Sequence, residues 1–208
     1  MIISAMLCAM LLALPAAADS GATDTRIEAA LDEIDSPGLE RYLASLNEAE
    51  RQEFLETKLP VAETISVEPQ APTDDAARRQ AARASSTGSQ LSLTASGCWT
   101  VRYNGSNQAA AGNTVYTYYT VLGWCSNGSS VTSAWLADAD GETATPGWTY
   151  NGVQQSDSGV VGNQGRAYAR HRFTFGAGGW DVITQDRCLR VRGFASSGST
   201  GEYICGIY

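Results

Sequence analysis

Hydrophobic and polar positions follow two different periods along the chain, and the change falls near residue 90. Before it, apolar residues recur every three or four positions in three short runs, which is typical of amphipathic helices. After it, short runs of β-branched and aromatic residues are separated by Gly, Asn, Ser and Asp, which is typical of strands joined by turns. The pattern therefore predicts a helical segment followed by a β domain.

The helical segment is predicted to span residues 19–60. Its three helices each have a start signal, namely Thr25 with Glu28, Ser36 with Pro37, and Asn47 with Glu50. Together they contain roughly 35 residues, too few to bury a core of their own. We therefore expect the segment to dock on the rest of the chain or on another chain. The alternative is a pro-segment that assists folding and is later removed.

Residues 61–90 are predicted to form a flexible linker. They are rich in Ala, Ser, Thr, Gln and acidic residues and contain few large side chains, so they gain too little from burial to become ordered. Arg78, Arg79 and Arg83 lie in this tract. In a disordered segment these arginines would be open to proteases, so processing of the chain here is one hypothesis.

Residues 91–208 are predicted to form an antiparallel β-sandwich or barrel of about eight strands, because no helical stretch separates the apolar runs. The candidate strands are residues 99–103, 114–124, 130–137, 148–153, 167–175, 181–185, 188–192 and 202–207. Asn-Gly pairs at 104–105, 127–128 and 151–152 predict turns between them.

Residues 1–18 have the pattern of a cleaved secretory signal peptide. An apolar run is followed by small residues at Ala16 and Ala18, as signal peptidase requires. The run is shorter than the roughly 20 residues that span a bilayer, and no later run is longer. We therefore expect a secreted, extracellular protein with no membrane span.

Four cysteines follow the signal, and in a secreted protein they are expected to form disulfides. Cys98 and Cys125 flank the first two predicted strands symmetrically, and Cys188 and Cys205 flank the last two, which favours Cys98–Cys125 and Cys188–Cys205. The nested pairing, Cys98–Cys205 with Cys125–Cys188, stays open.

Each favoured pairing also fixes a strand register, because opposed residues of an antiparallel hairpin have a constant index sum. The first disulfide places Trp99 opposite Trp124, and the second places Arg190 opposite Tyr203.

The formal net charge of −8 lies entirely in residues 19–90, because residues 91–208 hold 7 acidic and 7 basic side chains. A neutral β domain and an acidic segment both lack the basic surface that follows a phosphate backbone. We therefore expect no nucleic-acid partner.

Gly97-Cys98-Trp99, a Gly-Trp-Cys-x-Asn-Gly motif at 123–128, Gly-Trp-x-Tyr at 147–150 and two later cysteines form a recurrent pattern. It resembles uncharacterised secreted proteins of actinobacteria over residues 97–205. The preference for Arg over Lys, with Lys58 the only lysine, fits such a high-GC source. The resemblance implies no activity and no functional residues.

The sequence does not contain the histidine and serine patterns of a hydrolase active site. His171 is the only histidine, and strand alternation places it on an apolar face with Phe173, which predicts a hydrogen-bonded core residue. Ser158 has no nucleophile-elbow sequence and precedes the histidine, which excludes a chymotrypsin-like order. We therefore expect no catalytic residue and no cofactor.

Asp138, Asp140 and Glu142 form the densest group of carboxylates. Such oxygens can bind Ca²⁺, and paired carboxylates can hydrolyse glycosides. The calcium-loop pattern fails, because Leu136 and Gly147 occupy the positions of its first and last ligands. We predict a solvated turn, since Asp and Gly favour turns, and keep the three acids as the alternative calcium candidate.

The predicted strand from residue 114 is apolar on both faces, so one face is either covered or exposed. If exposed, Tyr116, Tyr118 and Trp124 would form a platform for sugar rings or a partner protein. Neighbouring strands would add the hydrogen-bond donors Arg170, Arg172, Arg190 and Arg192. Alternatively, the aromatic residues pack in the core and the arginines pair with acids.

The sequence thus favours a non-catalytic extracellular domain that binds a glycan or a protein. The alternatives are a small secreted hydrolase acting on polysaccharide or cell wall through Asp138, Asp140 or Glu142, and a secreted inhibitor or toxin released by cleavage near Arg79 or Arg83. The pattern does not address the oligomeric state.

Overall fold

The computed structural model describes residues 20–34, 36–69 and 96–208. The predicted signal peptide and residues 70–90 of the predicted linker, with its arginines, lie outside the described residues. The described elements are α1 (Ser20–Ile34), α2 (Pro37–Ser45), α3 (Glu48–Thr57), β1 (Pro60–Pro69), β2 (Gly97–Ala109), β3 (Thr114–Ser126), β4 (Val131–Thr143), β5 (Trp148–Val161), β6 (Gln164–Ala177), β7 (Trp180–Phe194) and β8 (Ser199–Glu202).

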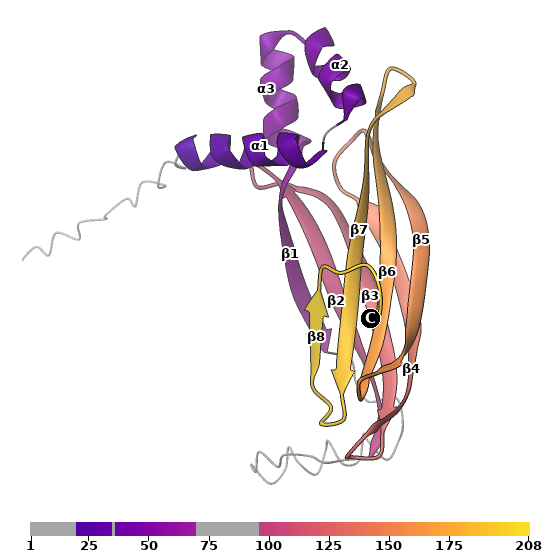
Figure 1. The fold of residues 1–208 in the computed structure, drawn as a ribbon. Coiled ribbons are helices and arrows are strands. Elements are labelled where there is room, and N and C mark those ends of the chain that lie inside the picture. The colour runs from indigo at the N-terminus through magenta and orange to yellow at the C-terminus, as the bar shows by residue number, and fades with distance from the viewer. Residues whose placement is uncertain (1–19, 35, 70–95) are drawn as a thin grey trace, which may run out of the picture.

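The strands form two antiparallel sheets of four, which confirms the predicted β class. Sheet A has the order β1-β2-β3-β4 and sheet B the order β5-β6-β7-β8. Strand β3 packs across β6 and β7, and β4 lies beside β5. Figure 1 shows long strands in two layers, with the three helices over one end.

Strand β1 was not predicted, because its residues from 61 onward had the composition of a linker. It pairs with β2 along its whole length, from Pro60 opposite Ala109 to Pro69 opposite Val101. Apolar residues do alternate here, but Glu63 interrupts the inward-facing series before Ile65. The structured part of the chain therefore includes a strand from the region before residue 90.

Other strand and turn boundaries also differ from the prediction, and the predicted strand 202–207 is replaced by β8 at Ser199–Glu202. Residues 181–185 and 188–192 belong to one strand, β7. Of the Asn-Gly pairs, Asn127-Gly128 forms a turn in which Asn127 Oδ1 accepts hydrogen bonds from the amides of Ser129 and Ser130, at 3.1 and 2.8 Å. The pair at 104–105 lies inside β2, and the pair at 151–152 lies at a register shift in β5 where Gly152 has a φ of +83°.

Two of the three helix start signals are confirmed. The Ser36 side chain accepts a hydrogen bond from the Leu39 amide before α2. Asn47 and Glu50 form the reciprocal capping box of α3. The first signal is wrong, because α1 begins at Ser20 and Thr25 lies inside it, donating to the Gly21 carbonyl at 2.9 Å.

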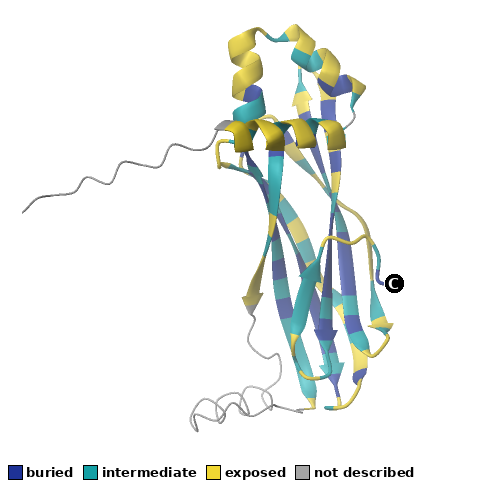
Figure 2. Cartoon of the chain, turned by 60° about the vertical axis from the view of Figure 1, so that its left-hand side comes forward, coloured by how far each residue is buried: buried dark blue, intermediate teal, exposed yellow. Residues whose placement is uncertain are grey.

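The helices dock on the sandwich of the same chain, as expected. The rings of Tyr42, Phe54 and Phe175 pack together, with Phe54 and Phe175 centroids 5.2 Å apart and Phe54 only 1% exposed. Trp148 Nε1 donates to the Lys58 carbonyl at 2.9 Å, and Ser36 Oγ to the Val182 carbonyl at 2.9 Å. The sides of the helices away from the sandwich are largely exposed (Figure 2).

Both favoured disulfides, Cys98–Cys125 and Cys188–Cys205, are present. The first lies in the β2–β3 ladder, with Trp99 opposite Trp124 as predicted. The register predicted for the second is wrong by one residue, because Arg190 pairs with Glu202.

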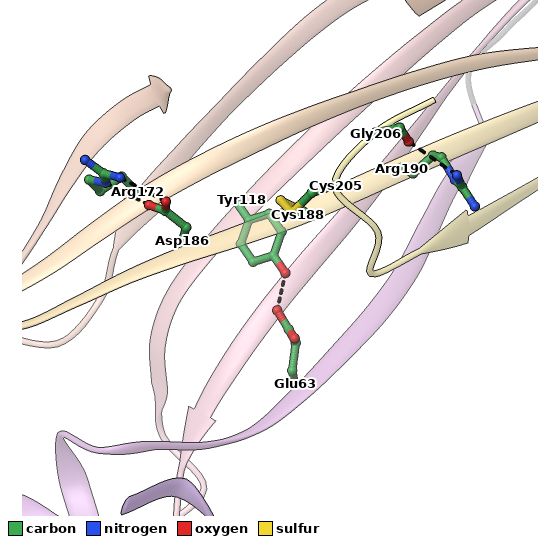
Figure 3. Close-up of a disulfide and its surroundings, with 8 residues drawn as sticks. All are labelled: Glu63, Tyr118, Arg172, Asp186, Cys188, Arg190, Cys205 and Gly206. Atoms are coloured by element: carbon green, nitrogen blue, oxygen red, sulfur yellow. Dashed lines mark hydrogen bonds and ion pairs between the residues drawn. A yellow bond between two sulfur atoms is a disulfide. The ribbon is translucent and has the colours of Figure 1, made fainter. Parts of the chain in front are cut away.

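The reason is that β8 ends at Glu202, so Cys205 lies beyond the ladder in the C-terminal segment. This segment is held by Arg190, whose Nη1 donates to the Gly206 carbonyl (Figure 3) and to the Tyr208 carbonyl. None of the described helices is long and apolar enough to cross a membrane.

Candidate functional site

The aromatic side chains predicted as a possible binding platform lie in the core. Tyr116, Tyr118 and Trp124 are 0–1% exposed, which rules out a surface role for them. Tyr116 stacks on Phe173 of sheet B, with ring centroids 4.0 Å apart. The even positions of β3 face the opposite sheet, so these large rings fill the space between the layers.

The hydroxyls of the two buried tyrosines are satisfied inside the fold. Tyr116 donates to Gln185 Oε1 at 2.8 Å and accepts from Arg187 Nε at 3.2 Å. Tyr118 donates to Glu63 of β1 (Figure 3). Burial raises the pKa of Tyr116 to about 12 and also raises that of Tyr118, so both phenols stay protonated.

The arginines proposed as ligand donors lie on the outward face of sheet B and pair mainly with acids. Arg172 makes a bidentate ion pair with Asp186 at 2.7 and 2.9 Å, and Arg170 lies on the same face of β6. Arg190 and Arg192 both contact Glu202. They share no surface with Tyr116, Tyr118 or Trp124, so the structure does not assemble that predicted site.

His171 is the core residue that the sequence predicts. It is fully buried, and its Nδ1 shares a hydrogen bond of 3.0 Å with the Tyr150 hydroxyl. Within the described residues, Nε2 has no hydrogen-bond partner. Burial lowers the pKa of His171 from 6.5 to about 4, against a smaller raising effect of Asp140.

This burial predicts a pH-dependent stability. The unfolded chain binds a proton at His171 at higher pH than the folded one, so the free energy of unfolding falls as the pH drops from 6.5 towards 4. We expect a loss of about 2 kcal/mol between pH 7 and pH 5 from this residue. Urea unfolding across that range measures it. His171→Gln should show a correspondingly smaller loss, and an equal loss in both proteins would contradict the assignment.

Asp138, Asp140 and Glu142 lie on strand β4 and not in a turn, which corrects the prediction. They occupy alternating positions on its outward face and are exposed. Among the described residues no group of three acids, histidines or cysteines is arranged to hold a metal ion. The calcium candidate is therefore not supported.

Asp140 and Glu142 border a pocket on the outward face of sheet A. The pocket has a volume of about 230 Å³, and its lining includes Arg102, Asn104, Thr117, Tyr119, Asp140 and Glu142. Tyr119 is the odd-numbered neighbour of the buried Tyr118, and its hydroxyl donates to Asp138 at 2.9 Å. The Arg102 guanidinium lies 3.4 Å from the Tyr119 ring centroid and donates to Asn104 Oδ1 at 2.8 Å.

Trp135 lies on the same face of sheet A, opposite Gly123 of β3. A Cβ at Gly123 would lie 2.3–2.6 Å from three atoms of the Trp135 ring, so the indole lies directly over the glycine backbone. The side chain is 39% exposed. Gly123 and Tyr119 are four residues apart on β3, which corresponds to about 13 Å along the strand. We call Trp135 and the pocket residues the outer face of sheet A.

The sequence did not indicate this site, because most large aromatic residues of β3 lie at its even positions and predicted a binding surface on that face. The usable signal was the hairpin turn at Asn127-Gly128, which indicates that β4 pairs with β3. Two register shifts, at Cys125/Ser126 and Val121/Leu122, then place Trp135 opposite Gly123 and Asp140 opposite Tyr119, and the turn alone does not predict them. In comparisons with protein-family models, with curated proteins and with solved structures, no match to this chain was found. The function must therefore be argued from the site itself.

Proposed function

We propose that this protein is a non-catalytic extracellular binding domain that binds a glycan on the outer face of sheet A. The observation that carries the proposal is the Trp135 ring, which lies over the Gly123 backbone on the same face as the polar pocket. An indole held in this way offers an apolar surface on which the C–H face of a sugar can stack.

The pocket adds the polar part of glycan recognition. Carboxylate oxygens of Asp140 and Glu142 accept hydrogen bonds, and the Asn104 amide and Arg102 guanidinium donate them, which matches the mixed donors and acceptors of a polyol. Its 230 Å³ is below the 300–1,000 Å³ typical of drug-sized ligands. One sugar ring in the pocket and another on Trp135 would suit an oligosaccharide lying along β3.

Other candidates are less well supported. The acids Asp138, Asp140 and Glu142 project from one strand in one direction, whereas a glycosidase places two carboxyl groups on either side of the bond it cleaves. Release of an inhibitor or toxin by cleavage near Arg79 or Arg83 concerns residues outside the described part of the chain. The two disulfides fit an oxidising, extracellular location.

Binding to soluble oligosaccharides of three or more rings, measured by calorimetry, tests the proposal. Trp135→Ala should weaken binding by about 2 kcal/mol, or roughly 30-fold, because it removes the stacking surface. Trp180→Ala is a matched control, since Trp180 is also 39% exposed but contacts Arg41 of α2.

We expect wild-type affinity in the Trp180 variant and weakened binding in Asp140→Asn. If Trp135→Ala and Asp140→Asn bind with the affinity of the wild type, the ligand does not bind on the outer face of sheet A. If none of a panel of plant, fungal and bacterial wall oligosaccharides binds, the proposal of a glycan ligand is wrong.

A further inference from the structure

A second pocket lies where helix α1 covers the edge of the sandwich. It has a volume of about 210 Å³ and is separate from the outer face of sheet A. Helix α1 contributes Arg26 and Glu33, strand β1 contributes Glu63, β2 contributes Asn107 and β7 contributes Arg187. The remaining wall consists of small or short apolar residues of α1 and β1, so only a small ligand fits.

Arg187 is fixed in position at this pocket. It lies on the inward side of β7, where its Nε donates to the Tyr116 hydroxyl at 3.2 Å and its Nη1 to Glu33 at 3.1 Å. Its side chain is 16% exposed. Burial alone would lower the pKa of Arg187, but Tyr116, Glu63 and Glu33 outweigh burial and raise it, so the guanidinium stays charged.

Glu63 is fixed in the same way. Its Oε1 accepts hydrogen bonds from the Tyr118 hydroxyl, seen in Figure 3, and from Asn107 Nδ2 at 3.0 Å. Asn107 is buried and Tyr118 almost completely so, which holds the carboxylate in one orientation. Its second oxygen, Oε2, makes no hydrogen bond to any residue that the structure describes.

A fixed carboxylate and a fixed guanidinium therefore line one pocket without neutralising each other. Glu63 is close enough to influence Arg187 electrostatically, yet no ion pair joins them in the described part of the chain. Arg187 Nη2, like Glu63 Oε2, has no hydrogen-bond partner among the described residues. With Arg26 and Glu33 at the helix, the pocket carries two positive and two negative side chains.

We propose that this pocket binds a small zwitterion, a free α-amino acid with a short side chain. Its carboxylate accepts hydrogen bonds from Arg187 Nη2, its ammonium group donates to Glu63 Oε2, and its side chain lies against the short apolar wall. A ligand with a single charge can pair with only one of Arg187 and Glu63, so it gains less binding free energy than a zwitterion does. Because Glu63 belongs to β1 of sheet A and Arg187 to β7 of sheet B, the ligand would also link the two sheets beside α1.

Thermal unfolding and calorimetry of the full chain with glycine and L-alanine test the proposal. Both amino acids should raise the midpoint of unfolding, and above the Kd the rise should continue with the logarithm of the ligand concentration. Propionate and ethylamine, which carry one charge each, should have no comparable effect. Glycylglycine, whose charges lie farther apart, should bind more weakly than glycine, which distinguishes a free amino acid from a peptide.

Two variants locate the site. Glu63→Gln keeps an oxygen that accepts from Tyr118 and Asn107 but loses the charge, and we expect it to weaken alanine binding by about tenfold or more. Ala29→Trp fills the pocket from the exposed side of α1 without touching the core, and it should abolish binding. Glu142→Gln makes the same change on the outer face of sheet A and should bind as the wild type does. The proposal is wrong if neither amino acid binds, if the singly charged compounds bind equally well, or if Ala29→Trp binds normally.

Discussion

A chain cut once between residues 70 and 95 should remain a single folded particle, although its halves are no longer covalently joined. A protease site engineered in this tract makes the cut. Strand β1 would stay hydrogen-bonded to β2 on the other side of the cut, from the pair Pro60–Ala109 to the pair Pro69–Val101. Size-exclusion chromatography should show the two fragments together under native conditions and separate in denaturant.

The fragment from residue 96 alone should fail to fold. It would expose the edge of β2, leave Tyr118 without Glu63, and strip Phe54 from Phe175. Loss of one buried Phe ring usually costs about 3–5 kcal/mol, and a whole domain is stable by only about 5–15 kcal/mol. We expect the fragment to lack the near-ultraviolet circular dichroism of the intact protein.

Adding the fragment that carries residues 20–69 should restore folding, and a version with Phe54→Ala should restore it less well. A fragment from residue 96 that is as stable as the whole chain would contradict this prediction. It would support the alternative that the helical segment is a removable pro-segment. The structure favours an integral segment, because Phe54 and Leu59 belong to the same buried core as the strands.

The sequence predicted the features that depend on local chemistry. Capping residues fixed the starts of α2 and α3, because a side-chain acceptor satisfies a free amide wherever the helix lies. The cysteine spacing predicted both disulfides. For Cys98–Cys125 the reason is the antiparallel ladder, which places residues of constant index sum opposite each other, whereas Cys205 lies beyond the β7–β8 ladder and only its closeness to Cys188 was predicted.

Features that depend on distant partners were not predicted. Glu63 is an acid at an inward position of β1, and it is tolerated there because Tyr118 and Asn107, far along the chain, satisfy its oxygen. That partnership cannot be inferred from composition, so the strand was interpreted as a linker. The same limit applies to the outer face of sheet A, where we propose that a ligand binds, since which side of β3 is covered depends on where sheet B packs.

Glycine content gave another misleading signal, because glycine favours turns but also makes room for rings. Gly105 was expected in a turn, and it lies inside β2 opposite Tyr118. A Cβ built on Gly105 would lie 2.3–2.7 Å from three atoms of the Tyr118 ring, so the phenol packs directly on the glycine backbone. A pairing of glycine with an aromatic ring therefore explains this residue better than turn chemistry does.

Gly105→Ala should consequently destabilise the protein by about 3 kcal/mol or more, since the added methyl group has no space. Tyr118 cannot move aside easily, because its ring is 1% exposed and its hydroxyl is bound to Glu63. The free energy of unfolding in urea measures the effect. Gly159→Ala is the matched control, because a Cβ there would lie 3.8 Å from Ile207 Cδ1, an ordinary van der Waals contact.

The control should unfold within about 1 kcal/mol of the wild type, as expected for an uncrowded strand position. If Gly105→Ala and Gly159→Ala have equal free energies of unfolding, the Tyr118 ring does not pack on Gly105. The hydrogen bond from Tyr118 to Glu63 would then lack that support. A large loss confined to Gly105→Ala would instead confirm that the Tyr118 ring packs on Gly105. This packing positions the hydroxyl that donates to Glu63, which contributes to the docking of β1 and to the amino-acid site that we propose.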